Sequence, residues 1–248
     1  MLPLQTKTRI VTGKLPIHIL LAPALLIMLT LVQPMPGFSQ SDLGTWNILN
    51  VKYSLNKKVS FFGEGQIRSL STYSQFHYHE YKCGFNYKPS PQIMFTLGIG
   101  DYDTYREGGN FESPKNNDER RLWPQITLYQ TIGKVKIEQR YRSESRFSPG
   151  IYRNRFRYRV GISIPFGKEK EGTKPFQFIV NNELFFTNTA PYFQRNRFLV
   201  ATQYRINKYL STQVGYLSQF DYKINDETGR QFLQIGLYLD LHRPEKKE

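Results

Sequence analysis

The chain has 248 residues and a formal net charge of +14 at pH 7, from 34 lysine and arginine residues against 20 aspartate and glutamate residues. Its single cysteine, Cys83, excludes an intramolecular disulfide and lies too far from the N-terminus to carry the lipid of a lipoprotein. The basic residues are spread along the chain at alternate positions and form no single patch, so we expect no nucleic-acid partner.

The N-terminus has the pattern of a cleaved signal peptide. Three cations, Lys7, Arg9 and Lys14, precede an uncharged apolar run at 17–32, and small residues lie at the expected cleavage site after Ser39. A membrane anchor is the alternative, but a spanning helix needs about 20 apolar residues, and Pro23 interrupts this run. We therefore predict a signal peptide at 1–39 and an exported domain at 40–248.

Charged and apolar residues alternate with a period of two along two neighbouring segments. The charged face of the segment 134–147 consists of Lys136, Glu138, Arg140, Arg142, Glu144 and Arg146. In the segment 153–166, four arginines lie on one face and apolar side chains on the other; the arginines are Arg153, Arg155, Arg157 and Arg159. This periodicity is typical of β-strands.

Weaker alternation of the same kind predicts the other strands. They lie at 44–55, 59–69, 76–88, 92–106, 119–132, 176–187, 195–206, 210–223 and 231–241. Because a membrane-spanning strand needs only about 9 to 11 residues, a mean hydropathy of −0.52 is compatible with such strands. We predict an all-β, antiparallel up-and-down transmembrane barrel. Eleven segments are recognised, but single-chain bacterial barrels have even strand numbers, so we expect about 10 to 12 strands with one missed or split.

A soluble β-sandwich is the alternative fold, because its strands also alternate between core and solvent. Short connections such as 56–58 alternate with longer ones, among them 70–75, 107–118 and 148–151, as in membrane barrels. Aromatic residues also cluster on the side of the longer connections, as an interfacial girdle would. They are Tyr73, Phe76, Tyr78, Tyr102, Tyr105, Tyr192, Phe193, Phe220 and Tyr222.

Several motifs also resemble those of a known family. The clearest are Gly44-Thr45-Trp46, Glu138-Gln139-Arg140-Tyr141-Arg142 and Asn154-Arg155-Phe156-Arg157-Tyr158-Arg159. Their order resembles the domain of unknown function 2490 family, exported proteins of Bacteroidetes and related bacteria that are predicted to form outer-membrane barrels. The resemblance spans nearly all of 40–248 and implies this fold and location. It supplies no catalytic or binding residues.

Groups that could carry out catalysis are few. We expect His77 and His79 on one strand face, but zinc normally needs three or four ligands, so we predict no metal site. Ser74 beside either histidine could serve a lipid-modifying acyl hydrolase or deacylase, although the chain lacks a nucleophile elbow. We therefore expect no enzyme activity and no cofactor, with the lipid-modifying enzyme as the alternative.

The arginine-rich strands predict the interior of the barrel. An arginine that faces lipid costs about 2 to 4 kcal/mol at the midplane, so the charged ladder must face the lumen. This ladder consists of Glu138, Arg140, Arg142, Glu144, Arg153, Arg155, Arg157 and Arg159. Positive charge exceeds the nearby acids, which include Glu119 and Glu183. A hydrated lumen would favour small anions, whereas a dry one would hold an ion-pair network that braces the barrel.

The expected function is a non-catalytic structural barrel or a narrow, porin-like, anion-leaning pore in the outer membrane of a Gram-negative bacterium. Its expected partners are membrane lipid, lipopolysaccharide, small anions, and the barrel-assembly machinery during insertion. Arg106 and Arg195 are candidates for holding lipopolysaccharide phosphates, because a guanidinium suits phosphate geometry.

Overall fold

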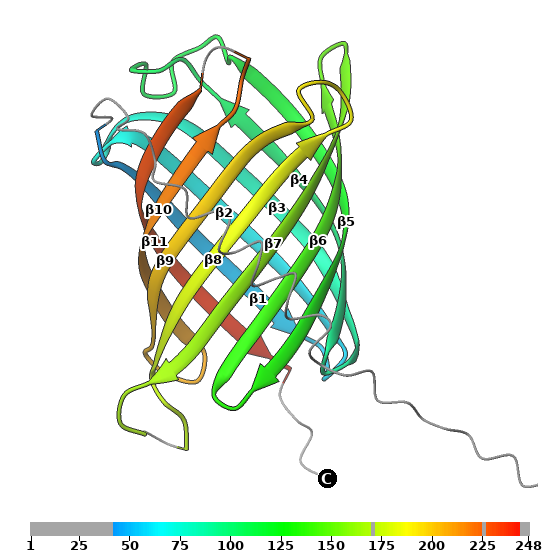
Figure 1. The fold of residues 1–248 in the computed structure, drawn as a ribbon, viewed down its shortest axis with the longest axis vertical. Coiled ribbons are helices and arrows are strands. Elements are labelled where there is room, and N and C mark those ends of the chain that lie inside the picture. Colours follow the sequence, from blue (N-terminus) through cyan, green and yellow to red (C-terminus); the bar gives the residue numbers. More distant parts are fainter. Residues whose placement is uncertain (1–41, 170–171, 225–226, 244–248) are drawn as a thin grey trace, which may run out of the picture. The chain divides into compact units, whose positions relative to one another are not determined.

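The computed structural model describes residues 42–169, 172–224 and 227–243, and the predicted signal peptide lies outside them. Every element in these ranges is a β-strand, and the eleven strands form one closed barrel (Figure 1). They are β1 (Gly44–Ser54), β2 (Val59–Ser71), β3 (Ser74–Ser90), β4 (Ile93–Thr104), β5 (Asn117–Ile132), β6 (Val135–Ser148), β7 (Ile151–Phe166), β8 (Phe176–Thr187), β9 (Phe193–Arg205), β10 (Leu210–Asp221) and β11 (Thr228–His242). Among the described residues there is no helix long and apolar enough to cross a membrane.

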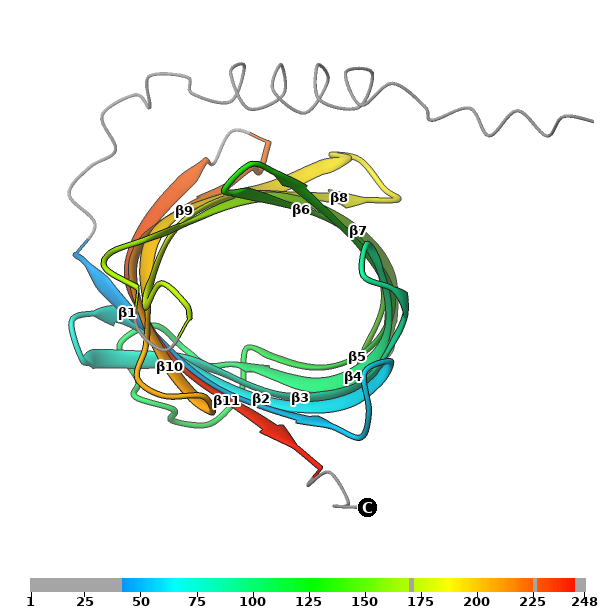
Figure 2. The same cartoon turned by 90° about the horizontal axis from the view of Figure 1, so that it is seen from below.

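The eleven strands coincide with the eleven predicted segments, which confirms the all-β barrel. Neighbours in sequence pair antiparallel, but β1 pairs with β11 in parallel, from Gly44 beside Phe232 to Ser54 beside His242. The prediction of a fully antiparallel barrel is therefore wrong at this seam. Successive hairpins reverse the chain direction, so the first and last of an odd number of strands run the same way. The expectation of a missed strand is also wrong for the described residues, because β1 and β11 close the ring (Figure 2).

Connections at the two ends of the barrel do not alternate cleanly in length. The upper end in Figure 1 carries 72–73, 105–116, 149–150, 188–192 and 222–227. The lower end carries 55–58, 91–92, 133–134, 167–175 and 206–209, and also the end of β11. Two connections predicted to be long are thus two-residue turns. Gly150, with φ of 71°, permits one of them, because this left-handed backbone is open to glycine.

Side chains alternate between the inside and the outside of the wall along most of each strand. In β5 the buried positions are Glu119, Arg121, Trp123, Gln125 and Thr127, and the exposed ones are Arg120, Leu122, Pro124, Ile126 and Leu128. The same holds around the ring, where large apolar side chains such as Leu97 and Ile99 of β4 are more than half exposed on the outer wall. Many polar and charged groups therefore lie inside, together with a buried apolar cluster that contains Trp46 and Phe232.

Candidate functional site

The interior of the barrel contains a cavity of about 1200 Å³, which we call the lumen. Its walls come from strands all around the ring and extend from Lys52 and Lys136 near the lower end to Glu107 and Arg230 near the upper end. Sixteen lysine and arginine side chains line it, against six aspartate and glutamate side chains. The lumen therefore has a strong excess of positive charge.

Seven of the eight residues of the predicted ladder line this cavity. The eighth, Glu144, lies behind two of them and has no exposed surface. Arg153 lies apart from the others, because it is exposed near the start of β7 and has no ion pair with any described residue. Five of the other ladder residues are joined through Glu144 and Glu183 in one network on the β6–β8 side of the lumen, and Glu138 and Arg159 form a separate pair.

Glu144 is the centre of this network. Arg155 donates to its Oε2 from Nε and Nη2, at 2.8 and 2.6 Å, and Arg157 donates to its Oε1 from Nη1 at 2.7 Å. Arg142 adds a weaker contact, with 3.6 Å between Nη1 and Oε1. A buried carboxylate is tolerable only when it is paired and hydrogen-bonded in this way.

A second buried acid, Glu183 of β8, extends the network. Arg157 donates to it from Nε and Nη2, at 3.0 and 2.9 Å, and Arg140 donates to the same carboxylate. Arg157 thus joins Glu144 to Glu183 across two strands, while Arg159 pairs with Glu138 lower down. The planar fork of a guanidinium makes such bridging possible.

Aromatic rings fill the lumen between the arginines. The guanidinium carbon of Arg68 lies 3.4 Å from the ring centre of Trp46 and 4.0 Å from that of Tyr78. Arg121 lies 3.7 Å from the ring centre of Tyr102. Tyr78 and Tyr102 are buried inside the barrel, so their assignment to an interfacial girdle is wrong. Cation–π contacts of desolvated groups contribute about 2 kcal/mol each.

The arginines of β7 differ in how far they are exposed to the lumen. The side chain of Arg159 is 27% exposed, Arg157 is 11% exposed and Arg155 is 5% exposed, and beyond them Arg153 is exposed again at the rim. Arg155 and Arg157, which pair with the buried Glu144, are therefore the most covered of these arginines.

A β-bulge separates the two histidines that were expected on one face. The register of β2 and β3 shifts between Arg68 and Ser69, which inserts one extra residue at His77. His77 consequently lines the lumen, whereas His79 packs on the outer wall against Tyr81, with ring centres 5.4 Å apart. The two cannot chelate one ion together.

The Ser74 hydroxyl is not brought to either histidine. Ser74 is exposed at the start of β3, and no described hydrogen bond joins it to His77 or His79. His79 instead lies beside Tyr105, with 3.2 Å between Nε2 and the phenol oxygen.

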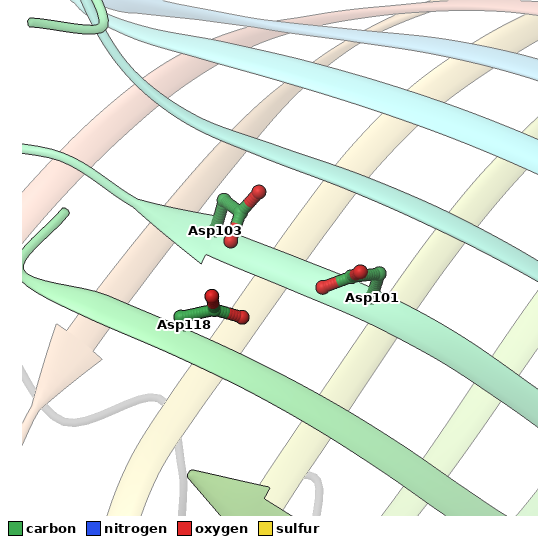
Figure 3. Close-up of side chains that lie close together, drawn as sticks. All are labelled: Asp101, Asp103 and Asp118. Atoms are coloured by element: carbon green, nitrogen blue, oxygen red, sulfur yellow. The ribbon is translucent and has the colours of Figure 1, made fainter. Parts of the chain in front are cut away.

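Three aspartates meet on the outer wall near the upper end, where sequence reasoning named no site. Asp101 and Asp103 of β4 and Asp118 of β5 place carboxylate oxygens within 4.8 Å of one another (Figure 3). Lys115 compensates them, because its Nζ lies 2.9 Å from Asp103 and 3.6 Å from Asp118. The hydrogen bond from Lys115 to Asp103 raises the pKa of this exposed amine. Its ammonium group therefore pairs with two of the three carboxylates.

Sequence reasoning missed the arginines on the weakly alternating strands. Arg68, Arg121 and Arg197 all line the lumen. The sequence pattern that could have identified them is the alternation of each arginine with apolar neighbours, such as Leu122 beside Arg121. Short stretches of mixed polarity obscured this alternation.

The chain matches the model of a known protein family over most of its length. Residues 43–230 match the model of a family described as a protein of unknown function (DUF2490). No curated protein matches the chain. The matched residues contain nearly all of the barrel and the whole of the buried ion-pair network, and they confirm the resemblance seen in the motifs. The chain belongs to the protein family of unknown function DUF2490.

Proposed function

We propose that the protein is a non-catalytic β-barrel of the bacterial outer membrane, whose basic lumen is braced and closed in its upper half by ion pairs and passes small anions weakly at most. The observation that carries this proposal is the inversion of polarity, with an apolar outer wall around a charged interior. A wall of this kind needs an apolar surrounding, because contiguous exposed apolar surface is rare on soluble monomers.

The outer wall supports a membrane position in two ways. Apolar side chains are exposed on almost every strand, including Phe61, Leu97 and Ile126. Aromatic residues also pack together toward both ends of the barrel, as at membrane interfaces. The upper set contains Phe147 with Tyr152 and Phe186 with Phe193, and the lower set contains Phe166, Phe176 and Tyr204.

Charged groups on the outer wall indicate where the hydrocarbon layer of the membrane would end. The aspartate cluster and Arg120 lie on the outside near the upper ends of β4 and β5. Because charge facing hydrocarbon is costly, this part of the wall belongs at headgroup level. The predicted signal peptide at 1–39 would supply the route of export, and the barrel-assembly machinery would insert the chain.

Only one of the two arginines expected to hold lipopolysaccharide phosphate keeps this role in the proposal. Arg195 pairs with Asp221 and lines the lumen, so it does not face the outer leaflet. Arg106 is exposed in the connection 105–116 and stays a candidate.

Conductance across a planar bilayer tests the proposal. Refolded residues 40–248 should give either no current or small, infrequent current steps. In a salt gradient, any such current should have a reversal potential that indicates anion selectivity. Insertion should be verified first, by protection of the barrel from protease in the same vesicles. Large, steady or cation-selective steps would contradict a closed, basic lumen.

A further inference from the structure

Arg197 of β9 differs from the arginines of the network. Its Nε donates to Gln219 Oε1 at 2.8 Å, and no carboxylate of the described residues lies within ion-pair distance of it. Its guanidinium carbon lies 4.8 Å from the ring centre of Trp46 and 4.8 Å from that of Phe185. The two rings fix the guanidinium against the wall of the lumen, and none of the described residues accepts a hydrogen bond from its two Nη nitrogens.

Acids near Arg197 are already engaged. Glu183 lies directly across from it in the β8–β9 pair, but accepts from Arg140 and twice from Arg157. Asp221 of β10 accepts from Arg195 and, at 2.6 Å, from the Gln219 amide. The same Gln219 side chain thus accepts from Arg197 and donates to Asp221. Arg197 therefore carries a positive charge that the barrel does not balance locally.

A second guanidinium approaches the same ring. Arg68 stacks on Trp46 at 3.4 Å, and its Nη2 donates to Glu80 at 3.0 Å, while its Nε is buried without a partner. Two cations thus share the Trp46 ring beside the cavity. An unbalanced cation in a poorly hydrated site is costly, and an anion from solution relieves that cost.

We propose that Arg197, held between Trp46 and Phe185, binds a small oxyanion, a phosphate or a carboxylate, inside the lumen. The two free Nη nitrogens present the forked donor geometry that such anions accept in a bidentate manner. The site deepens the proposed function, since it places the anion preference of the lumen at one residue. It does not depend on conduction, because an anion can bind in a lumen that no ion crosses.

Titration calorimetry in low-chloride detergent solution tests the site with inorganic phosphate as the probe. Refolded residues 40–248 should bind phosphate, and Arg197→Gln should weaken this binding about tenfold or more, because it removes a charge-assisted pair of hydrogen bonds. Arg197→Lys, which keeps the charge and loses the fork, should weaken it less. Acetate should compete with phosphate if the site recognises oxyanions in general, whereas phosphate binding without acetate competition would restrict the ligand to phosphate.

Arg153→Gln is the matched control. It removes the same charge from the lumen at an exposed position that has no ion pair with the described residues. Binding by this variant should stay within about twofold of the parent protein. Equal losses of phosphate affinity in Arg153→Gln and Arg197→Gln would overturn the proposal, because they would show that anions respond to the overall positive potential of the lumen. Absence of phosphate binding by the parent protein would overturn it as well. If Arg197→Gln does not fold, Arg197→Lys with parental affinity would overturn it as well. Conductance is measured separately, so failure of the site leaves the proposed function standing.

Discussion

Replacing Glu144 by glutamine should destabilise the barrel strongly. The substitution keeps the shape of the side chain but removes the charge that accepts three hydrogen bonds, two from Arg155 and one from Arg157. A glutamine has one accepting oxygen instead of two, so at least one of the three bonds is lost and the others lose the carboxylate charge. A hydrogen bond to a charged group contributes about 1.5 to 3 kcal/mol, so the total loss is about 3 kcal/mol. Arg155 loses its described acid partner altogether, whereas Arg157 retains Glu183. The total agrees with the cost of about 3 to 5 kcal/mol for breaking a buried ion pair.

Urea unfolding of the refolded barrel, followed by tryptophan fluorescence, measures this loss in the free energy of unfolding. Glu107→Gln is the matched control, because Glu107 also pairs with an arginine, Arg230, but its side chain is 61% exposed. That control should change stability by less than about 1 kcal/mol. Adding Arg155→Met to Glu144→Gln should recover part of the loss, since it removes the unpaired buried cation. A loss below about 1 kcal/mol for Glu144→Gln would refute the view that this network holds the lumen together.

Two other predictions address the outer wall. Cys83 is exposed on the outside of β3 between Tyr81 and Phe85. In lipid vesicles it should therefore react with an apolar thiol reagent and resist a charged one, and unfolding in urea should abolish this difference. Rapid labelling by the charged reagent in vesicles would contradict the membrane position. Lys115→Ala should create calcium binding at the cluster of Asp101, Asp103 and Asp118, because it removes the ammonium group that compensates their charge. Calorimetry of this variant without a calcium signal would show that the three carboxylates do not form an ion site.

Strand positions could be predicted well because alternation is a local property. The predicted segments 134–147 and 153–166 lie within about two residues of β6 and β7, where four arginines repeat at every second position. Closure of the barrel could not be predicted in the same way. The parallel pairing of β1 with β11 joins residues at opposite ends of the chain, and no pattern within one strand records its partner.

The charged inner face of the lumen could be predicted from the sequence, but the pairing of its charges could not, for a similar reason. A ladder of like residues shows which face is inside, but the acids that balance it come from neighbouring strands, as Glu183 does for Arg157. The β-bulge at His77 also shows the limit of period-two reasoning, because one inserted residue turns two successive side chains inward. Contacts such as Arg197 on Trp46 join β9 to β1, and only the closed ring brings them together.

The preference for arginine over lysine in this lumen follows from the inverted polarity of the barrel. With many apolar side chains on the outer wall, the β6–β8 side of the interior is held by ion pairs, and several of its cations contact more than one partner. Arg157 contacts Glu144 from one side of its guanidinium, Glu183 from another, and lies 4.6 Å from the ring centre of Phe185. A lysine ammonium is a compact point charge that cannot make these planar contacts together. The arginine ladder therefore belongs to the core of the barrel, beside the buried apolar cluster that contains Trp46 and Phe232. An anion that approaches Arg155 or Arg157 must compete with the carboxylates of Glu144 and Glu183, whereas Arg197 has no such competitor among the described residues.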